Sequence, residues 1–443
     1  METNSSRNFI VIPAPLQALH QACRMVYPNQ TNPLQVSALV KYWLGGPDPL
    51  DYISMFSNDG VPEQRIPPHW HYVSFGLSDL HGDGRVHKFS GPGLPSGFGF
   101  ELTFRLKKSP EETAPPTWPA NLMQSLAKYV FKSGNTLAIG DHVSWHCGLD
   151  GKKSSKIHHL LLDRDPQLAS VENVSGIVDF VQIVGVFLEE LEAAQRWNGM
   201  GVLNILKTLP KSGGPWLVTD MTRAKSIFEL DESVKAAIEN GIINEGSNLS
   251  GVNSTCVWSD RFIPRKEIPN YVYNKEEFMK TYCQLIKSSV EMDLNEQQWH
   301  SFSSGDNIDD SQITECPLRV LDCLHIVLNK EAGYLLPLVV SGRLKHGRHF
   351  TFKSVIHNVA ITFVAPNVTG TSKYVSASQP YAVYGSWVQI YIPEDFILEL
   401  DAAVNIFNEK NQISLPQTFY WPYRSLAISV ISENDPMVME EEN

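Results

Sequence analysis

The feature that most constrains this chain is a run of alternating apolar residues near the end of its first quarter. Phe98, Phe100, Leu102, Phe104 and Leu106 occupy every second position. Successive side chains of a β-strand point to opposite faces of the sheet, so this spacing predicts a strand with one buried face. A chain that contains such a strand must form a sheet with a hydrophobic core against it.

The residues before this run supply a partner strand. Apolar side chains recur through 72–77, and a turn-rich segment follows at 80–85, where Asp83 lies between Gly82 and Gly84. Glycine readily adopts the positive φ angles of tight turns, and aspartate favours turns because its carboxylate accepts hydrogen bonds from nearby backbone N–H groups. The sequence therefore predicts that two strands reverse direction here.

Length and charge limit the class of protein. The 443 residues exceed a typical domain of roughly 100–200 residues, so we expect two domains. The formal net charge of −12 argues against a nucleic-acid-binding protein, which needs a concentrated basic face. We therefore expect protein partners and no direct contact with nucleic acid.

The N-terminal residues and the cysteines indicate the compartment. Residues 1–16 lack the basic and apolar regions of a signal peptide, and no apolar run approaches the ~20 residues of a membrane-spanning helix. The six cysteines form no Cys-x-x-Cys pair, which favours reduced thiols over a disulfide frame or a zinc cluster. We therefore expect a cytosolic or nuclear protein without a membrane contact.

Helices and strands are interleaved in the first half of the chain without the regular spacing of βαβ units. Apolar periodicity predicts helices over 16–26, 33–44 and 118–131, and strands over 140–146 and 216–221. A mixed α+β domain suits this half better than a doubly wound sheet.

The character of the chain changes after residue 258. Polar and charged residues replace the aromatics over 259–314, which predicts a flexible, partly disordered linker. Beyond it, apolar patterns predict a smaller, strand-rich domain, with strands over 334–344 and 350–355 among others.

The predicted fold class is therefore α+β, with two mixed α/β-sheet domains joined by a flexible, partly disordered linker. The predicted parts are a flexible tail at 1–13, a first domain at 14–258, the linker at 259–314, a second domain at 315–432 and an acidic tail at 433–443.

Histidine is the only abundant reactive side chain in the first domain. His69 and His71 lie two residues apart and so share one face of a strand, and together with His142 they suggest a metal-dependent hydrolase. Against this, no third ligand follows at a familiar spacing, and 142–146 lack the glutamate that His-Glu-x-x-His motifs use as a base. We favour hydrogen-bonded structural histidines and expect no metal, no cofactor and no enzymatic activity.

Other charged clusters also have two readings. Residues 343–349 are the strongest basic cluster, which could hold an acidic or phosphorylated partner, but we favour a solvated hairpin turn between two strands. Asp141 and the run Asp163-Arg164-Asp165 could hold a cation, but aspartate is common at strand ends and turns. The residues alone indicate a two-domain α+β protein without a convincing nucleophile, acid–base pair or cofactor loop.

Long segments of the chain resemble the Suppressor of Fused family. They include HWHYVSFGLSDLHGDGRVHKF at 69–89, GDHVSWH at 140–146, GGPWLVTDM at 213–221 and GRLKHGRHFTFKS at 342–354. The resemblance covers nearly everything except the tails and the linker. It implies a cytosolic and nuclear negative regulator of Hedgehog signalling that binds proteins and has no catalytic residues.

The resemblance further implies how the partner is held. Two α+β domains close around a Ser-Tyr-Gly-His-Leu segment of a Gli or Cubitus interruptus zinc-finger transcription factor, which adds as a strand between them. In this β-augmentation, backbone hydrogen bonds supply affinity and side-chain pockets supply selectivity. The transcription factor is thereby sequestered. The kinase Fused and other members of the Hedgehog complex are further possible partners.

Five peptide-binding residues follow from the resemblance by position. Tyr129 matches a tyrosine that lines the groove, and Asp141 matches the acid that pairs with the motif histidine. Val252 and Ser254 fall on an edge strand that meets the peptide, and Leu335 is the contact from the second domain.

One departure from the family pattern concerns the second acid beside the motif histidine, whose place is taken by Arg164. Either Asp163 or Asp165 takes over its role, or Asp141 acts alone, and we expect weaker or differently protonated recognition than two acids give. The alternatives from other classes are the hydrolase above and a general scaffold that binds through its linker and acidic tail.

Overall fold

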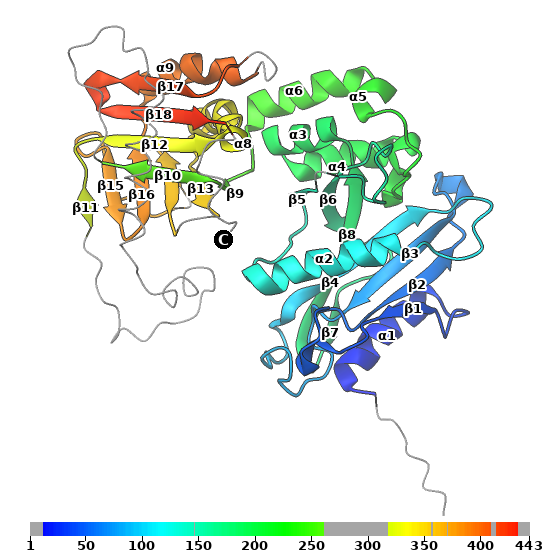
Figure 1. Cartoon of the computed structure of the whole chain (residues 1–443). Helices are drawn as coiled ribbons and strands as arrows, with labels where there is room; N and C mark the ends of the chain where they lie inside the picture. Colours follow the sequence, from blue (N-terminus) through cyan, green and yellow to red (C-terminus); the bar gives the residue numbers. More distant parts are fainter. Residues whose placement is uncertain are drawn as a thin grey trace, which may run out of the picture. The chain divides into compact units, whose positions relative to one another are not determined.

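The computed structural model describes residues 12–145, 147–260, 318–355, 358–369, 371–408 and 413–432 of the chain. It divides into two compact units, the first ending at Gly241 and the second beginning at Ile242 (Figure 1). Each unit contains both helices and sheets, so the predicted α+β class is confirmed. Among the described residues, no helix is long and apolar enough to span a bilayer.

The described part of the first unit is organised around one eight-stranded sheet. Its strand order is β1-β2-β3-β4-β8-β6-β5, and β7 pairs with β8. β3 and β4 are antiparallel, which confirms the predicted reversal, whereas β4 and β8 are parallel. The strands are β1 (Leu34–Ser37), β2 (Tyr52–Asn58), β3 (His69–Phe75), β4 (Pro95–Lys107), β5 (His142–Ser144), β6 (His159–Arg164), β7 (Val171–Asn173) and β8 (Gly176–Val186).

Helices cover both faces of this sheet. The alternating apolar side chains of β4 are at most 5 % exposed between Phe100 and Leu106, and they pack in one cluster with α2 (Trp118–Ser133). On the opposite face, α1 (Ala14–Val26) packs against β2 and β3, and α3 (Leu188–Arg196) and α4 (Gly199–Thr208) pack against β6. The helices predicted over 16–26 and 118–131 are therefore confirmed.

Shorter helical elements complete the first unit. α6 extends across the boundary between the units. These elements are η1 (Tyr42–Leu44), η2 (Pro62–Gln64), η3 (Pro210–Ser212), η4 (Gly214–Trp216), α5 (Ile227–Leu230) and α6 (Ser233–Glu245).

The described part of the second unit forms two sheets over one core. The four-stranded sheet has the order β10-β12-β18-β17 and the six-stranded sheet the order β11-β15-β16-β14-β13-β9. Buried side chains of both sheets, such as Ile428 and Phe352, belong to the same cluster. The strands are β9 (Gly251–Ser254), β10 (Cys256–Ser259), β11 (Arg319–Val320), β12 (Leu324–Asn329), β13 (Phe350–Ser354), β14 (Ala360–Val364), β15 (Tyr381–Tyr384), β16 (Trp387–Tyr391), β17 (Gln417–Trp421) and β18 (Leu426–Ile431).

Helical elements lie between these strands. The strand predicted over 350–355 is present as β13, and a helix, α9, follows β16. The helical elements are α8 (Lys330–Gly333), the π-helix η6 (Leu338–Arg343), η7 (Leu344–His346), α9 (Glu394–Val404), η8 (Asn405–Asn408) and η9 (Pro422–Arg424).

The predicted end of the first domain, at residue 258, lies too far along the chain. β9 pairs with β13 and β10 pairs with β12, so residues 251–259 are part of the sheets of the second unit. Residues 259 and 260 are ordered at the end of β10, and the rest of the predicted linker at 259–314 lies outside the described residues. The same holds for the acidic tail at 433–443 and for most of the tail at 1–13.

Three secondary-structure predictions are wrong because pairing and burial overrode the local pattern. The strand predicted over 216–221 is absent, since η4 ends at Trp216 and only Thr219 makes an isolated bridge, with Leu106. The segment predicted as a helix over 33–44 forms β1 and η1, since residues 34–37 pair in register with β2. The segment predicted as a strand over 334–344 forms a turn followed by η6. A short apolar run that is buried all round, as Leu338–Val340 is, fits a strand or a buried helix equally well.

The basic cluster at 343–349 is not a solvated hairpin turn. Arg343 is 5 % exposed, and its guanidinium donates hydrogen bonds to the carbonyl oxygens of Ser247 (2.8 Å) and His349 (2.9 Å). Burial and the neighbouring Arg348 lower the pKa of Arg343 to about 10. This arginine ties together backbone segments of its own unit.

Candidate functional site

Each unit contains a short strand at an edge of its sheet. β5 is the last strand of the sheet in the first unit and pairs with β6, Val143 lying opposite Leu160. β9 is the last strand of the six-stranded sheet in the second unit and pairs with β13. No described strand pairs with the outer side of either one. An edge strand presents unpaired N–H and C=O groups to which an extended segment can add.

On β9, alternate residues point their backbone groups away from the sheet. The carbonyl oxygens of Ser250 and Ser254 accept hydrogen bonds from the N–H groups of Thr351 and Val355, each at 2.9 Å. In a parallel pair, every second residue of a strand directs its N–H and C=O groups to the partner strand. The residues that alternate with them direct these groups to the opposite side. Asn253, opposite Lys353 in the register, is one of these residues.

The three candidate side chains of the second unit lie at different depths. Val252 is half-buried on β9 and packs against the core, and Ser254 is 8 % exposed. Leu335 is half-buried in the turn between α8 and η6, where its carbonyl oxygen accepts a hydrogen bond from Val339 N–H at 2.9 Å. The side chain of Leu335 therefore belongs to a helical turn and not to the strand that the sequence predicted.

Asp141 lies at the start of β5 with its side chain exposed. Its carboxylate Oδ2 accepts a hydrogen bond from Ala138 N–H at 2.8 Å, and its carbonyl oxygen accepts one from Leu162 N–H at 2.9 Å. The preceding Gly140 donates its N–H to the Leu162 carbonyl at 2.7 Å and has a φ of 90°, which favours glycine. These contacts fix the aspartate at the edge of the sheet while leaving its carboxylate at the surface.

Tyr129 is exposed on α2. The residue is 43 % exposed, and its hydroxyl accepts a hydrogen bond from Asn135 Nδ2 at 3.0 Å. Ser133 Oγ donates a hydrogen bond to the Tyr129 carbonyl at 2.7 Å, just before α2 ends at Gly134. Both predicted contact residues of the first unit, Tyr129 and Asp141, are thus accessible.

Asp163 does not replace the missing second acid. It is 3 % exposed, and its Oδ2 lies 2.6 Å from Lys207 Nζ on α4. Side chains alternate between the two faces along β6. Arg164 therefore lies on the same face as Leu162, which α2 covers, and Asp163 lies on the opposite face. Arg164 itself is exposed. The carboxylate of Asp163 is therefore used for an ion pair within the unit.

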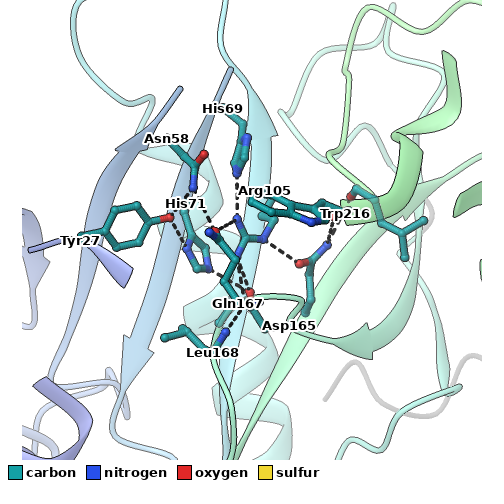
Figure 2. A network of polar contacts seen from close by, with 12 residues as sticks. Tyr27, Asn58, His69, His71, Arg105, Asp165, Gln167, Leu168 and Trp216 are labelled. Carbon is teal, nitrogen blue, oxygen red and sulfur yellow. Dashed lines mark hydrogen bonds and ion pairs between the residues drawn. The ribbon is translucent and has the colours of Figure 1, made fainter. Parts of the chain in front are cut away.

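Asp165 is also withdrawn from the surface. Its carboxylate accepts hydrogen bonds from Arg105 Nη2 at 2.9 and 3.0 Å, and its Oδ2 lies 3.0 Å from His71 Nε2 (Figure 2). Its Oδ1 also accepts the backbone N–H groups of Gln167 and Leu168. Although burial disfavours the charged form, His71 and Arg105 hold the pKa of Asp165 well below its usual range. The prediction of Asp165 as a peptide contact is wrong, because the pair lies in the core.

The same network accounts for both nitrogens of His69 and His71. His69 contacts the Pro67 carbonyl and Arg105 Nη1, each at 2.8 Å, and His71 contacts the Tyr27 hydroxyl at 2.8 Å and Asp165. Burial, followed by the charge of Arg105, lowers the pKa of His69 to about 3 and that of His71 to about 4. Both imidazoles are therefore neutral at pH 7 and fully occupied by protein partners.

The three histidines named for the hydrolase alternative, His69, His71 and His142, do not form one site. His142 lies on β5, and three strands separate it from β3, a distance of about 19 Å at the usual strand spacing. In the described part of the chain no three histidine, cysteine or acidic side chains are grouped so that they could hold a metal ion.

The sequence analysis missed this buried network. Arg105 lies on the face of β4 that also carries the polar residues Glu101 and Thr103, and all three are fully buried. One signal for the network was available from the pairing of β3 with β4, which places Arg105 directly opposite His71. An arginine next to a histidine across two central strands would have indicated a buried acid to balance them.

Comparisons with known proteins were made at three levels. Two family models match, "Suppressor of fused protein (SUFU)" over residues 46–224 and "Suppressor of Fused Gli/Ci N terminal binding domain" over residues 236–430. The human protein called "Suppressor of fused homolog" is 45 % identical over 446 residues, covering 94 % of this chain and 92 % of that protein. The mouse protein of the same name has the same identity and coverage.

Solved structures agree with these matches. The crystal structure of Drosophila Suppressor of Fused matches with a TM-score of 0.73 and 39 % identity, covering 95 % of this chain and 97 % of that one. A chain of the Sufu-Fu complex crystal structure matches with a TM-score of 0.50 and 51 % identity, covering 52 % of this chain and 98 % of that one.

Proposed function

Because the chain belongs to the Suppressor of Fused family of Hedgehog-pathway regulators, we propose that it binds Gli or Cubitus interruptus transcription factors through a Ser-Tyr-Gly-His-Leu segment. The segment adds as a strand, and the chain thereby restrains the nuclear entry and the activity of its partner as a negative regulator. The observation that carries the proposal is the outer side of β5 and of β9, which no described strand covers.

The chemistry of the two edges supports this binding mode. Backbone groups on the outer side of β9 are available for a ladder of hydrogen bonds, each contributing about 0.5–1.5 kcal/mol. The exposed carboxylate of Asp141 lies at the start of the edge strand β5, where it attracts a protonated histidine of the segment. Exposed Tyr129 offers a ring for packing. No step of this function makes or breaks a covalent bond, so the proposal assigns no catalytic residue, cofactor or metal.

In this proposal Asp141 acts as the single acid beside the motif histidine. Asp163 and Asp165 are committed to Lys207 and Arg105. Arg164 repels an imidazolium wherever the two approach. Recognition is therefore weaker at acidic pH than a two-acid arrangement allows.

The decisive experiment removes one backbone donor from the outer side of β9. Asn253→Pro deletes an N–H that points away from β13, so the pairing of β9 within its sheet is retained. We expect the affinity for a fluorescent Ser-Tyr-Gly-His-Leu peptide, measured by anisotropy, to fall about two- to tenfold. Asn253→Ala keeps the N–H and is the matched control, with affinity close to that of the parent chain. Equal affinities for the two variants would exclude strand addition at β9.

The Fused kinase is a second partner in this proposal, and the protein acts in both the cytoplasm and the nucleus. The support is the match to a chain of the Sufu-Fu complex, which is 51 % identical to about half of this chain. Co-precipitation of the full chain with Fused, and imaging of a tagged chain before and after pathway activation, test the two statements separately.

A further inference from the structure

Among the charged residues that line a pocket in the first unit, cations outnumber acids by five to two. The pocket has a volume of about 580 Å³ and lies where β4 ends, beside η2, η3 and the segment that leads into α5. Its composition contrasts with the chain as a whole, whose formal net charge is −12. The charged lining residues are Arg65, Lys107, Lys211, Arg223 and Lys225, against Asp220 and Glu229.

Two of these cations are already neutralised. Lys107 Nζ lies 2.7 Å from Asp220 Oδ2. Although burial disfavours its charged form, hydrogen bonds from Lys107 and Thr222 hold the pKa of Asp220 below its usual range. The Arg223 guanidinium donates hydrogen bonds of 2.6 Å to each carboxylate oxygen of Glu190, which is fully buried. These pairs are fixed parts of the wall.

The other three cations are not balanced. Arg65, Lys211 and Lys225 are exposed and make no ion pair with any described residue. Glu229, whose carboxylate accepts the N–H of Ser226 at the start of α5, makes no ion pair with them among the described residues, so the lining keeps an excess of positive charge. A concave site lined by one sign of charge focuses the potential and attracts counter-ions.

Three separate segments bring these cations to one pocket. Arg65 follows η2 with a φ of 60°, in a turn closed by the pairing of Val61 with Ile66. Lys211 lies in η3, and Lys225 precedes α5. The convergence is a property of the fold, because no basic run of the sequence contains all three.

We propose that this pocket binds a phosphate group, supplied either by a phosphorylated side chain of a protein or by a small free polyphosphate. The planar guanidinium of Arg65 matches two phosphate oxygens at once, and the ammonium groups of Lys211 and Lys225 neutralise the remaining charge. With Glu229 in the lining, these three cations leave an excess of two positive charges, which favours a group with two negative charges. The site is distinct from the strand edges of the proposed function, so either can fail without the other.

The test uses the full chain in isothermal titration calorimetry at low ionic strength, where exposed charges are least screened. The probes are inorganic pyrophosphate and the peptide acetyl-Gly-Gly-phosphoSer-Gly-Gly-amide, each compared with the unphosphorylated peptide. We expect saturable binding of one phosphate per chain for at least one probe. Binding of the phosphopeptide alone identifies a protein source, binding of pyrophosphate alone identifies a small ion, and binding of both leaves the pocket assigned to phosphate in general.

A pair of matched variants locates the site. The double variant K211E/K225E reverses two pocket charges and is expected to weaken binding at least tenfold. The control K153E/K235E makes the same change in net charge at two exposed lysines outside the pocket lining, and it is expected to stay within twofold of the parent chain. Circular dichroism melts confirm that both variants fold. Saturable binding of neither probe, or equal weakening by the two double variants, overturns the proposal.

Discussion

Two aspartates of the first unit have the same chemistry but opposite surroundings. Asp141 lies exposed at the edge strand β5 and receives a single hydrogen bond from Ala138 N–H through its carboxylate. Asp165 is 4 % exposed and balances Arg105 and His71 in the core. The difference teaches that exposure and pairing, and not residue type, decide whether an acid is committed to the core or accessible to a partner. Each prediction below changes one side of this comparison.

The largest effect is expected for Asp165→Asn. The substitution leaves the Arg105 guanidinium, which is fully buried, without its counter-charge, and breaking a buried pair typically costs about 3–5 kcal/mol. We expect the free energy of unfolding, measured by urea denaturation followed by circular dichroism, to fall by that amount. Asp141→Asn is the control and should change it by less than about 0.5 kcal/mol. Comparable losses for the two variants would remove the distinction between them.

The pH dependence of stability tests the same network. The pKa of His71 is about 4 in the folded chain and about 6.5 in an unfolded one, so the unfolded state binds more protons between these values. His69 behaves alike, with a folded pKa of about 3. Stability is therefore full above pH 6.5 and is lost as the pH falls below it, by about 1.4 kcal/mol per pH unit for each histidine.

The variant that tests this assignment is His71→Gln. It cannot take up the proton on unfolding, so its stability should depend less steeply on pH between 6 and 5, by about 1 kcal/mol per unit. Asp165, whose pKa is depressed, contributes only below about pH 4, where its unfolded carboxylate is protonated. Urea denaturation of both proteins at pH 7, 6 and 5 gives the slopes. Parallel slopes would show that His71 is not a buried neutral imidazole.

The fold was predictable where one periodicity dominated. The alternation in β4 and the helical spacing in α1 and α2 required no knowledge of the rest of the chain. The alternation did not reveal what covers the second face of the sheet, because that depends on α1, which precedes β4 by some seventy residues in the sequence. Glu101, Thr103 and Arg105 point to this second face of the sheet. They are buried although they are polar, because distant segments cover that face.

The candidate site was only partly predictable. The family resemblance located Asp141 and Tyr129 at exposed positions and Val252 and Ser254 on an edge strand. It could not separate Asp141 from Asp165, since each aspartate adjoins a strand and the buried partners of Asp165 come from distant segments. The pocket cations were invisible to sequence reasoning because they converge only in the folded unit.

On the recognition side, Asp141→Asn should weaken peptide binding. The asparagine oxygen can still accept the Ala138 N–H, so the turn is kept while the charge that attracts the motif histidine is removed. We expect a loss of about 1–3 kcal/mol in binding free energy at pH 6, where a free histidine is largely protonated, and a smaller loss at pH 8. Anisotropy with a labelled Ser-Tyr-Gly-His-Leu peptide measures both. The exposed Asp59→Asn is the matched control, and equal affinities for the two variants at pH 6 would remove the acid from the site.

The smallest effect is expected for Arg164→Glu, which restores an acid at the position where the family pattern has one. Arg164 is exposed, so the gain is limited by solvent screening to about 0.5–1 kcal/mol, or two- to fivefold in affinity. The sign follows from charge: the change replaces repulsion of an imidazolium by attraction, so the gain should be larger at pH 6 than at pH 8. Lys153→Glu makes the same reversal at an exposed lysine on a loop and controls for net charge. A gain that is independent of pH, or one shared by Lys153→Glu, would mean that the strand position of Arg164 does not face the bound histidine.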